Sequence, residues 1–297
     1  MTPIMVKCLM ALSLLLVTLE ELSAQKEILN PEGCGVSSYK TMIVNGTKVK
    51  DTQYPWVVYL DTYFPTIKLY CGGTIITKRH VLTAAHCLMN KAYVYVQKVI
   101  VSYGSVHRRH GTKVDATKMF IHKGFDYVNG VNDIALLEVK YPFPFGKAVA
   151  PICLPLAPSP IAYKDAIAAG WGSLYLGGRG KDFLRHTTST IFPDTICARI
   201  YTRYVGGLQC CARKRGKGIC KGDSGGPLMI RTGVGRYQQV GVTSYVYGIC
   251  GGDYPDVYTL VSGHTNWLTR GVSSSAGYMP LHTGNAYTLE SGPFFIA

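Results

Sequence analysis

Gly222-Asp223-Ser224-Gly225-Gly226-Pro227 is the most informative stretch of this chain. Its serine lies between an aspartate and two glycines. Small residues there let the backbone turn sharply and let a carbonyl group approach backbone N–H groups. A glycine-rich turn around a serine is common, so G-x-S-G alone does not define a site. The flanking Asp223 and Pro227 favour a nucleophile over an ordinary turn.

Two earlier stretches supply the partners that a nucleophilic serine needs, namely Thr83-Ala84-Ala85-His86-Cys87 and Asp133-Ile134-Ala135-Leu136-Leu137. A serine hydroxyl is activated when an imidazole accepts its proton and a carboxylate holds that imidazole in one tautomer. His86 follows small residues suited to a buried turn. Asp133 opens an apolar run, where a carboxylate is costly unless it is paired. We therefore predict His86 as base, Asp133 as orienting carboxylate and Ser224 as nucleophile.

The composition favours a folded, β-rich chain. Of 297 residues, 47% are hydrophobic and only 16% are charged, which argues against disorder. From Ile43 onward, short apolar runs rich in Val, Ile, Tyr and Thr alternate with Gly, Pro, Asn and Asp. This pattern predicts an all-β sandwich or barrel rather than βαβ units.

The first residues are typical of a secretory signal. Lys7 precedes the apolar run Leu9–Leu19, and Ser23-Ala24 offers small residues for cleavage. The run is too short to span a bilayer, and no later stretch is long enough, so we expect a secreted, extracellular protein without a membrane span.

Secretion makes disulfides the expected state of the cysteines. Of the 10 cysteines, Cys8 lies in the signal, which leaves nine and therefore at least one unpaired within the chain. The spacings match no zinc site and do not determine the connectivity.

The formal net charge of +14 predicts attraction to acidic partners such as sulfated glycans and other polyanions. Nucleic acid is excluded as a partner, because no binding motif is present and the chain is exported.

Further motifs identify a family resemblance: Ile43-Val44-Asn45-Gly46, Ala169-Gly170-Trp171-Gly172, Pro255-Asp256-Val257-Tyr258 and Trp267. With the three stretches above, they resemble the chymotrypsin/trypsin-like serine proteases. The resemblance implies an all-β fold of two six-stranded antiparallel β-barrels with the active site in the cleft between them, and a short C-terminal helix. It also implies a secreted serine endopeptidase made as a zymogen, without cofactor or metal, whose substrates are proteins or peptides.

The apolar leader, the resemblance over 43–270 and the lack of periodicity after residue 270 together divide the chain into four parts. We expect a signal peptide at 1–24, a pre-segment at 25–42, the protease domain at 43–270 and a loosely ordered tail at 271–297.

The resemblance also implies supporting roles. Gly222 and Ser224 would supply the N–H groups of an oxyanion hole, and Ser244 would support Asp133. The implied disulfides are Cys34–Cys153, Cys71–Cys87, Cys197–Cys211 and Cys220–Cys250. Whether Cys197 takes Cys210 or Cys211 stays open, and Cys210 would then be the unpaired cysteine.

Substrate choice departs from the usual family pattern. Gly218 stands where trypsin-like members carry an aspartate, and Ile219 follows it. Asp256 stands at a pocket position that is usually glycine, and it could receive Arg or Lys or serve a structural role instead. Val246 narrows the mouth of the pocket. We therefore expect an atypical primary specificity.

Activation departs from the pattern as well. In the family, a cut before Ile43 frees an amine that pairs with Asp223, but the preceding residue is Met42 rather than Arg or Lys. We expect an activating protease that cuts after Met42, with protein inhibitors as further candidate partners. The alternative is a non-catalytic protease homologue that acts as an extracellular binding cofactor.

Overall fold

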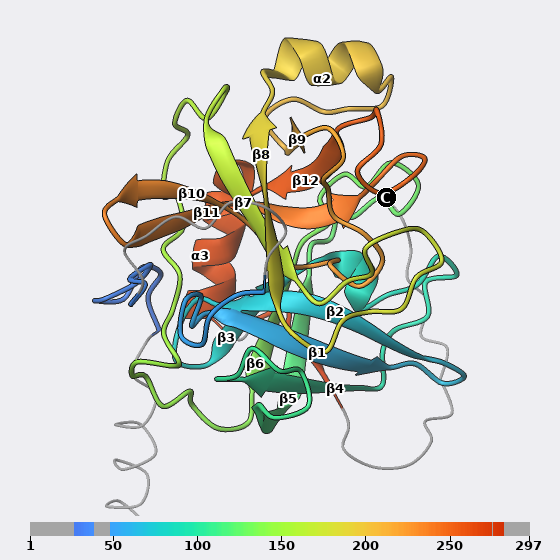
Figure 1. Ribbon diagram of the computed structural model, residues 1–297. Helices are drawn as coiled ribbons and strands as arrows, with labels where there is room; N and C mark the ends of the chain where they lie inside the picture. Colours follow the sequence, from blue (N-terminus) through green and yellow to red (C-terminus); the bar gives the residue numbers. More distant parts are fainter. Residues whose placement is uncertain (1–26, 39–47, 275, 282–297) are drawn as a thin grey trace, which may run out of the picture.

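Two closed antiparallel β-barrels make up the body of the molecule (Figure 1). The computed structural model describes residues 27–38, 48–274 and 276–281. The first barrel consists of β1 (Val57–Tyr63), β2 (Lys68–Ile75), β3 (His80–Thr83), β4 (Lys98–Tyr103), β5 (Thr112–Ile121) and β6 (Ala135–Val139). Its strand order is β5-β4-β1-β2-β3-β6, and a β5–β6 pairing closes it.

The second barrel runs in the order β10-β11-β12-β9-β8-β7 and is closed by the β10–β7 pairing. Its strands are β7 (Asp165–Gly170), β8 (Arg185–Ile191), β9 (Gln209–Arg213), β10 (Pro227–Gly233), β11 (Arg236–Tyr245) and β12 (Asp256–Leu260). The remaining elements are the 3₁₀ turns η1 (Ala85–Cys87) and η2 (Val261–His264), the helices α2 (Asp194–Ile200) and α3 (Thr265–Ser273), and the short strand β13 (Met279–Pro280). The fold predicted from the sequence is confirmed.

Short apolar runs explain why these segments form barrels. In β3 and β6, Val81 pairs with Leu137 and Leu82 with Leu136, and all four side chains are buried. A run of consecutive apolar residues suits a strand whose two faces are both covered by neighbouring layers. A helix at the surface would expose part of the same run to solvent.

The two barrels share a continuous apolar core. Trp56, which precedes β1, donates its indole N–H to Met229 Sδ of β10 at 3.1 Å. Thr74 of β2 donates to Gln239 Oε1 of β11 at 2.6 Å, so a buried polar link also crosses the interface. These contacts hold the barrels in one relative position, which a site built from both of them requires.

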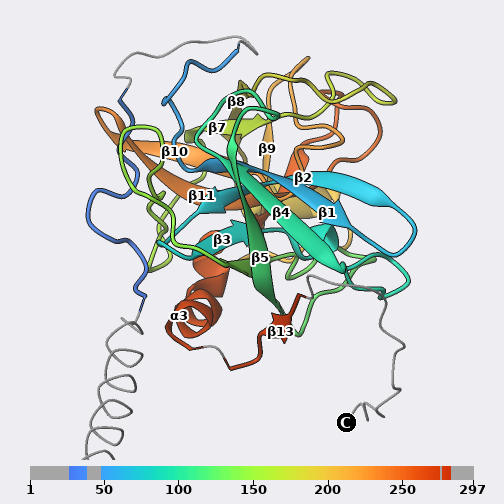
Figure 2. The same cartoon turned by 90° about the horizontal axis from the view of Figure 1, so that it is seen from below.

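The chain beyond the second barrel returns to the first (Figure 2). In α3, Trp267 stacks on Phe120 of β5 with ring centroids 4.9 Å apart. Tyr278 stacks on the same Phe120 at 5.1 Å, and β13 pairs with β5. Leu281 is buried beyond it. The expectation of a loose tail from residue 271 is not met at residues 271–274 and 276–281, because the end of α3, aromatic stacking and strand pairing order these residues. Residues 282–297 lie outside the described part.

The pre-segment is tied to the body in the region that the structure describes. Cys34 forms a disulfide with Cys153, and the Asn30 side chain bonds both backbone groups of Leu154 at 2.7 and 2.9 Å. The predicted signal at 1–24 and the predicted amino terminus at Ile43 lie outside the described residues. No helix in the described ranges is long and apolar enough to cross a membrane.

Candidate active site

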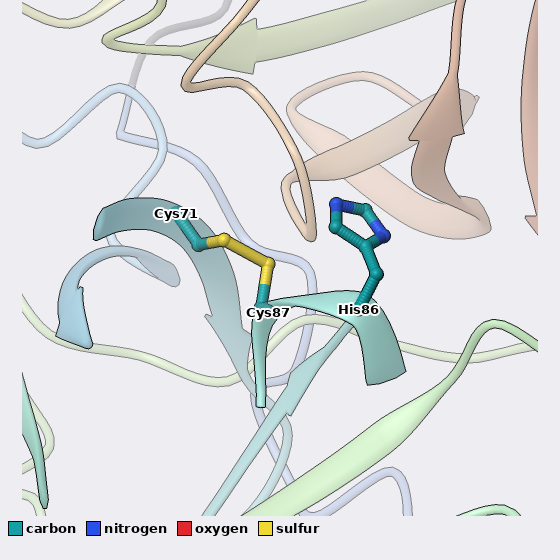
Figure 3. Close-up of side chains that lie close together, drawn as sticks. All are labelled: Cys71, His86 and Cys87. Atoms are coloured by element: carbon teal, nitrogen blue, oxygen red, sulfur yellow. A yellow bond between two sulfur atoms is a disulfide. The ribbon is translucent and has the colours of Figure 1, made fainter. Parts of the chain in front are cut away.

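His86 is held by covalent and backbone anchors directly after β3. It lies in η1, and its neighbour Cys87 forms a disulfide with Cys71 of β2 (Figure 3). The imidazole ring extends away from the two sulfur atoms. Both cysteine sulfurs are bonded to each other, so this cluster of Cys71, His86 and Cys87 offers no pair of thiolates to a metal.

Asp133 is a buried carboxylate, and both of its oxygens take part in hydrogen bonds. Its Oδ2 lies 2.7 Å from His86 Nδ1 and accepts the Ser244 hydroxyl at 2.6 Å, while Oδ1 accepts the His86 backbone N–H at 2.9 Å. Thr259 donates to the Asp133 carbonyl at 2.8 Å. Residues of both barrels therefore fix one carboxylate, and the fixed carboxylate orients one imidazole.

The electrostatics of this pair favour an imidazolium beside a carboxylate. Burial alone would raise the pKa of Asp133, but the His86 charge and the bonds from His86 and Ser244 outweigh it, so the pKa is lowered. Burial alone would lower the pKa of His86, but Asp133 outweighs it and the pKa is raised. An imidazole with this partner accepts a proton more readily than a buried imidazole without one.

The loop that carries Ser224 packs against the segment that carries His86. The Gly72 N–H donates to the Ser224 carbonyl at 2.7 Å, and Gly72 follows the disulfide-bonded Cys71. A methyl group on Gly225 would come 2.2 Å from Thr83 Oγ1, which shows how closely the two loops meet. In the described part of the chain, no hydrogen bond joins Ser224 Oγ to His86, so the loops meet while this last contact stays open. Such contacts commonly tighten only when substrate binds.

Gly222 occupies a position that only glycine suits. Its φ of +98° is rare for L-residues, and a Cβ there would come 2.5 Å from the Tyr70 ring. Among the described residues, the N–H groups of Gly222 and Ser224 donate to no protein acceptor. They are therefore free to bind an oxygen at the reacting centre.

Asp223, which directly precedes Ser224, lines a cavity of about 320 Å³. Its carboxylate accepts the backbone N–H of Gly172 at 2.7 Å and of Cys220 at 2.9 Å. Burial raises the pKa of Asp223 to about 6. Gly170 and Gly172 leave the room for the carboxylate, because a Cβ on either would come within 2.4 Å of its oxygens. No cation pairs with Asp223 in the described ranges.

Asp256 is a buried carboxylate that, like the part-buried Asp223, has no cation among the described residues. It begins β12, is 5% exposed, and accepts the Ile219 N–H at 3.0 Å. Its Oδ2 lies where a Gly218 side chain would be, 2.8 Å from the position of a Cβ. Burial raises the pKa of Asp256 to about 7. Val246 packs against the apolar cluster that contains Ile219, so these four residues lie in one region.

A cavity of about 620 Å³ that the sequence did not point to opens next to His86 and Asp133. Five tyrosines line it: Tyr127, Tyr201, Tyr245, Tyr247 and Tyr254. Arg203 Nη1 donates to Asn129 Oδ1 at 3.0 Å and so joins a second-barrel loop to a first-barrel loop at its rim. The 21 tyrosines of the chain were the available signal, but they are spread over many segments and only the fold gathers these five.

Four disulfides are present, and one described cysteine is free. They join Cys34–Cys153, Cys71–Cys87, Cys197–Cys211 and Cys220–Cys250. Cys197 thus takes Cys211, and Cys210 is buried and unpaired. Burial raises the pKa of the Cys210 thiol to about 12, so it stays protonated and behaves as a small apolar side chain.

Comparisons with known proteins agree with this geometry. The family model described as Trypsin matches residues 43–268. Serine protease SP24D of Anopheles gambiae is 34% identical over 227 residues, which cover 76% of this chain and 79% of that protein. Chymotrypsin-2 of Vespa crabro is 33% identical over 229 residues, covering 77% of this chain and 99% of that protein. The solved structure of HL collagenase aligns with a TM-score of 0.67 at 26% identity, covering 77% of this chain and 98% of that one.

The chain belongs to the trypsin family of serine proteases. Its class is that of a serine endopeptidase, a hydrolase whose substrates are proteins.

Proposed function

We propose that the protein cleaves peptide bonds through an acyl-enzyme formed on Ser224. His86 takes the Ser224 proton as the hydroxyl attacks the substrate carbonyl, and Asp133 stabilises the imidazolium. His86 then gives that proton to the leaving amine, and a water molecule repeats the sequence to release the acyl group. The observation that carries the proposal is the 2.7 Å bond between His86 Nδ1 and the buried Asp133, beside the loop of Ser224.

The developing negative charge on the substrate oxygen would be bound by the Gly222 and Ser224 N–H groups. Their lack of protein acceptors in the described ranges supports this role. Removing one such donor costs about 10²–10³-fold in kcat in a related mechanism, so this contribution is large.

For the residue before the cut, we propose that Asp256 attracts Lys or Arg. A buried carboxylate is costly without a cation, and Asp256 has none among the described residues. Its position over Gly218 supports a role at the base of the pocket. Val246 opposes long side chains, so the specificity differs from that of a pocket with an aspartate at 218. The competing interpretation is that Asp256 serves only to accept the Ile219 N–H.

We propose that a cut after Met42 activates the chain. The amine of Ile43 would then enter the cavity beside Asp223 and supply the missing cation. Support comes from the partners of Asp223, which are only backbone N–H groups in the described part, and from the adjacent cavity of about 320 Å³. Secretion fits the disulfides and the apolar leader at 9–19.

The test is to secrete the chain and a Ser224→Ala variant, sequence the amino terminus of each processed form, and profile both on a peptide library. The expected result is Ile43 at the terminus, cleavage by the parent chain alone, and covalent labelling of Ser224 by a fluorophosphonate. Full activity with Thr41 at the terminus would reject the activation proposal. If the parent chain and Ser224→Ala give the same cleavage profile, catalysis by Ser224 is rejected. The alternative of a non-catalytic homologue that acts as a binding cofactor is then favoured.

A further inference from the structure

Two loops, one from each barrel, meet in a strongly basic surface. The loop after β4 contacts the loop before β8: Arg108 N–H donates to the Asp182 carbonyl at 3.0 Å, and Leu184 N–H donates to the Val106 carbonyl at 2.7 Å. We define the basic surface by the five cations on or beside these loops: Lys48, Arg108, Arg109, Arg179 and Lys181. Because backbone hydrogen bonds join the loops, the charges belong to one surface.

One carboxylate opposes these five cations. Asp182 lies 2.9 Å from Arg108 Nη2 and 3.7 Å from Arg109 Nη2. Within the described ranges, Arg179 and Lys181 pair with no carboxylate. The Arg109 side chain is 71% exposed, so its charge faces solvent despite the long contact. The surface therefore keeps a strong positive potential for an acidic partner.

An apolar tip adjoins the basic surface. Leu174, Tyr175 and Leu176 are consecutive in the same second-barrel loop and are 54%, 64% and 62% exposed. Single exposed apolar residues are ordinary, but a run of three is unusual for a soluble chain unless it serves binding. A partner that matches both parts must carry acidic groups and apolar side chains together, as a polypeptide does.

Aromatic rings connect the basic surface to the nucleophile. Arg108 lies beside the Tyr59 hydroxyl, and Tyr59 stacks on Tyr70 with centroids 6.1 Å apart. The Tyr70 ring then reaches the main chain at Gly222, where a Cβ would come 2.5 Å from it. Gly222 is two residues from Ser224, whereas the tyrosine-lined cavity lies beside His86. A peptide bound across Ser224 extends in two directions, and one of them leads over Tyr70.

We propose that the basic surface and its apolar tip bind an acidic segment of a protein substrate, one that also carries apolar side chains and lies outside the bond to be cut. This inference rests on the proposed function for its substrate, but the surface itself does not depend on catalysis. A sulfated polysaccharide would satisfy the charges and leave Leu174, Tyr175 and Leu176 exposed, so an acidic polypeptide is the better match.

The binding test uses the catalytically silent Ser224→Ala chain and a fluorescein-labelled peptide in which glutamates alternate with leucines. We expect Arg109→Glu with Lys181→Glu to weaken binding by about tenfold or more, since two attractions become repulsions. The matched control is Arg213→Glu with Arg215→Glu, which changes the net charge equally in another basic stretch. Replacing glutamate by glutamine in the peptide should abolish binding, and added salt should weaken it.

The kinetic test uses the parent chain with two substrates of one cleavage sequence, with and without the acidic segment. We expect the Arg109/Lys181 variant to raise KM about tenfold for the extended substrate only. Equal weakening by the Arg213/Arg215 control would overturn the proposal, as would tight binding of a heparin fragment with none of the peptide. If the parent chain binds the peptide but cleaves neither substrate, the proposed function is rejected and the proposed binding surface stands.

Discussion

Asp133 and Asp256 are both buried carboxylates, yet the hydrogen-bond partners that surround them differ. Asp133 accepts bonds from His86 and Ser244, and its pKa is lowered. Asp256 accepts one backbone N–H, and its pKa is raised to about 7. The chain itself completes the first site. The second site has no cation among the described residues, and we propose that a basic side chain of the substrate supplies it.

The largest expected effect follows from a change at Asp133. Asp133→Asn should lower kcat by about 10⁴-fold, the size found for this change in a related triad, because the amide holds the wrong imidazole tautomer. Thermal unfolding should show that the variant remains folded. Asp115→Asn, a partly exposed carboxylate of the same barrel, is the matched control and should leave kcat unchanged. A loss below tenfold for Asp133→Asn would remove Asp133 from the mechanism.

The next effect concerns the position of Asp223, a part-buried carboxylate that also has no cation in the described part. Gly172→Ala places a Cβ 2.4 Å from its Oδ2 and must displace it. A shift near 1 Å can cost about 10²-fold in rate, so we expect a loss of that size in steady-state kcat/KM. Gly146→Ala is the control, because open space surrounds that position. Unchanged activity of Gly172→Ala would contradict the role of Asp223.

A smaller effect is expected at Asp256. Asp256→Asn keeps an acceptor for Ile219 N–H but removes the charge. The ratio of kcat/KM for a Lys substrate over a Leu substrate should fall by about 30-fold, which corresponds to a lost buried charge pair of about 2 kcal/mol. Asp253→Asn, whose side chain is 85% exposed, should leave the ratio unchanged. If both variants behave alike, Asp256 has a structural role only.

The smallest effect is a pH dependence of that same ratio. The raised pKa of Asp256, about 7, means that the carboxyl is neutral below this pH and charged above it. The Lys-to-Leu ratio should therefore rise about tenfold from about pH 6 to 8, while the contribution of His86 cancels between the two substrates. In Asp256→Asn the ratio should be flat.

The stability of the folded parent chain should change with pH in the opposite direction, falling as pH rises. A folded-state pKa above the unfolded value means that the native state holds more protons, so the stability of the parent chain falls relative to Asp256→Asn as pH rises from about 4 to 7. Urea unfolding of both chains across that range measures the difference. A growing advantage of the parent chain with pH would contradict the raised pKa.

Local pattern was sufficient to predict an all-β chain, and the motifs implied the two barrels and the proposed triad through their resemblance to a family. Alternating and continuous apolar runs indicate strands, and His86, Asp133 and Ser224 each lie in a distinctive local context. The tail was mispredicted because Tyr278 and Leu281 have no local periodicity. Their order comes from Phe120 and β5, more than 150 residues earlier in the chain.

The amino-acid sequence by itself determined the fold class, the family and the types of residue that perform the reaction, since these depend on short motifs and on residue chemistry. Only the tertiary structure decided that Asp133 has a cationic partner and that Asp256 has none among the described residues. It also decided that Cys197 pairs with Cys211, that five tyrosines share one cavity, and that Arg108 and Asp182 join two loops. Burial and distance between remote segments set these outcomes, because a charge or a ring acquires its role from neighbours that only the folded chain supplies.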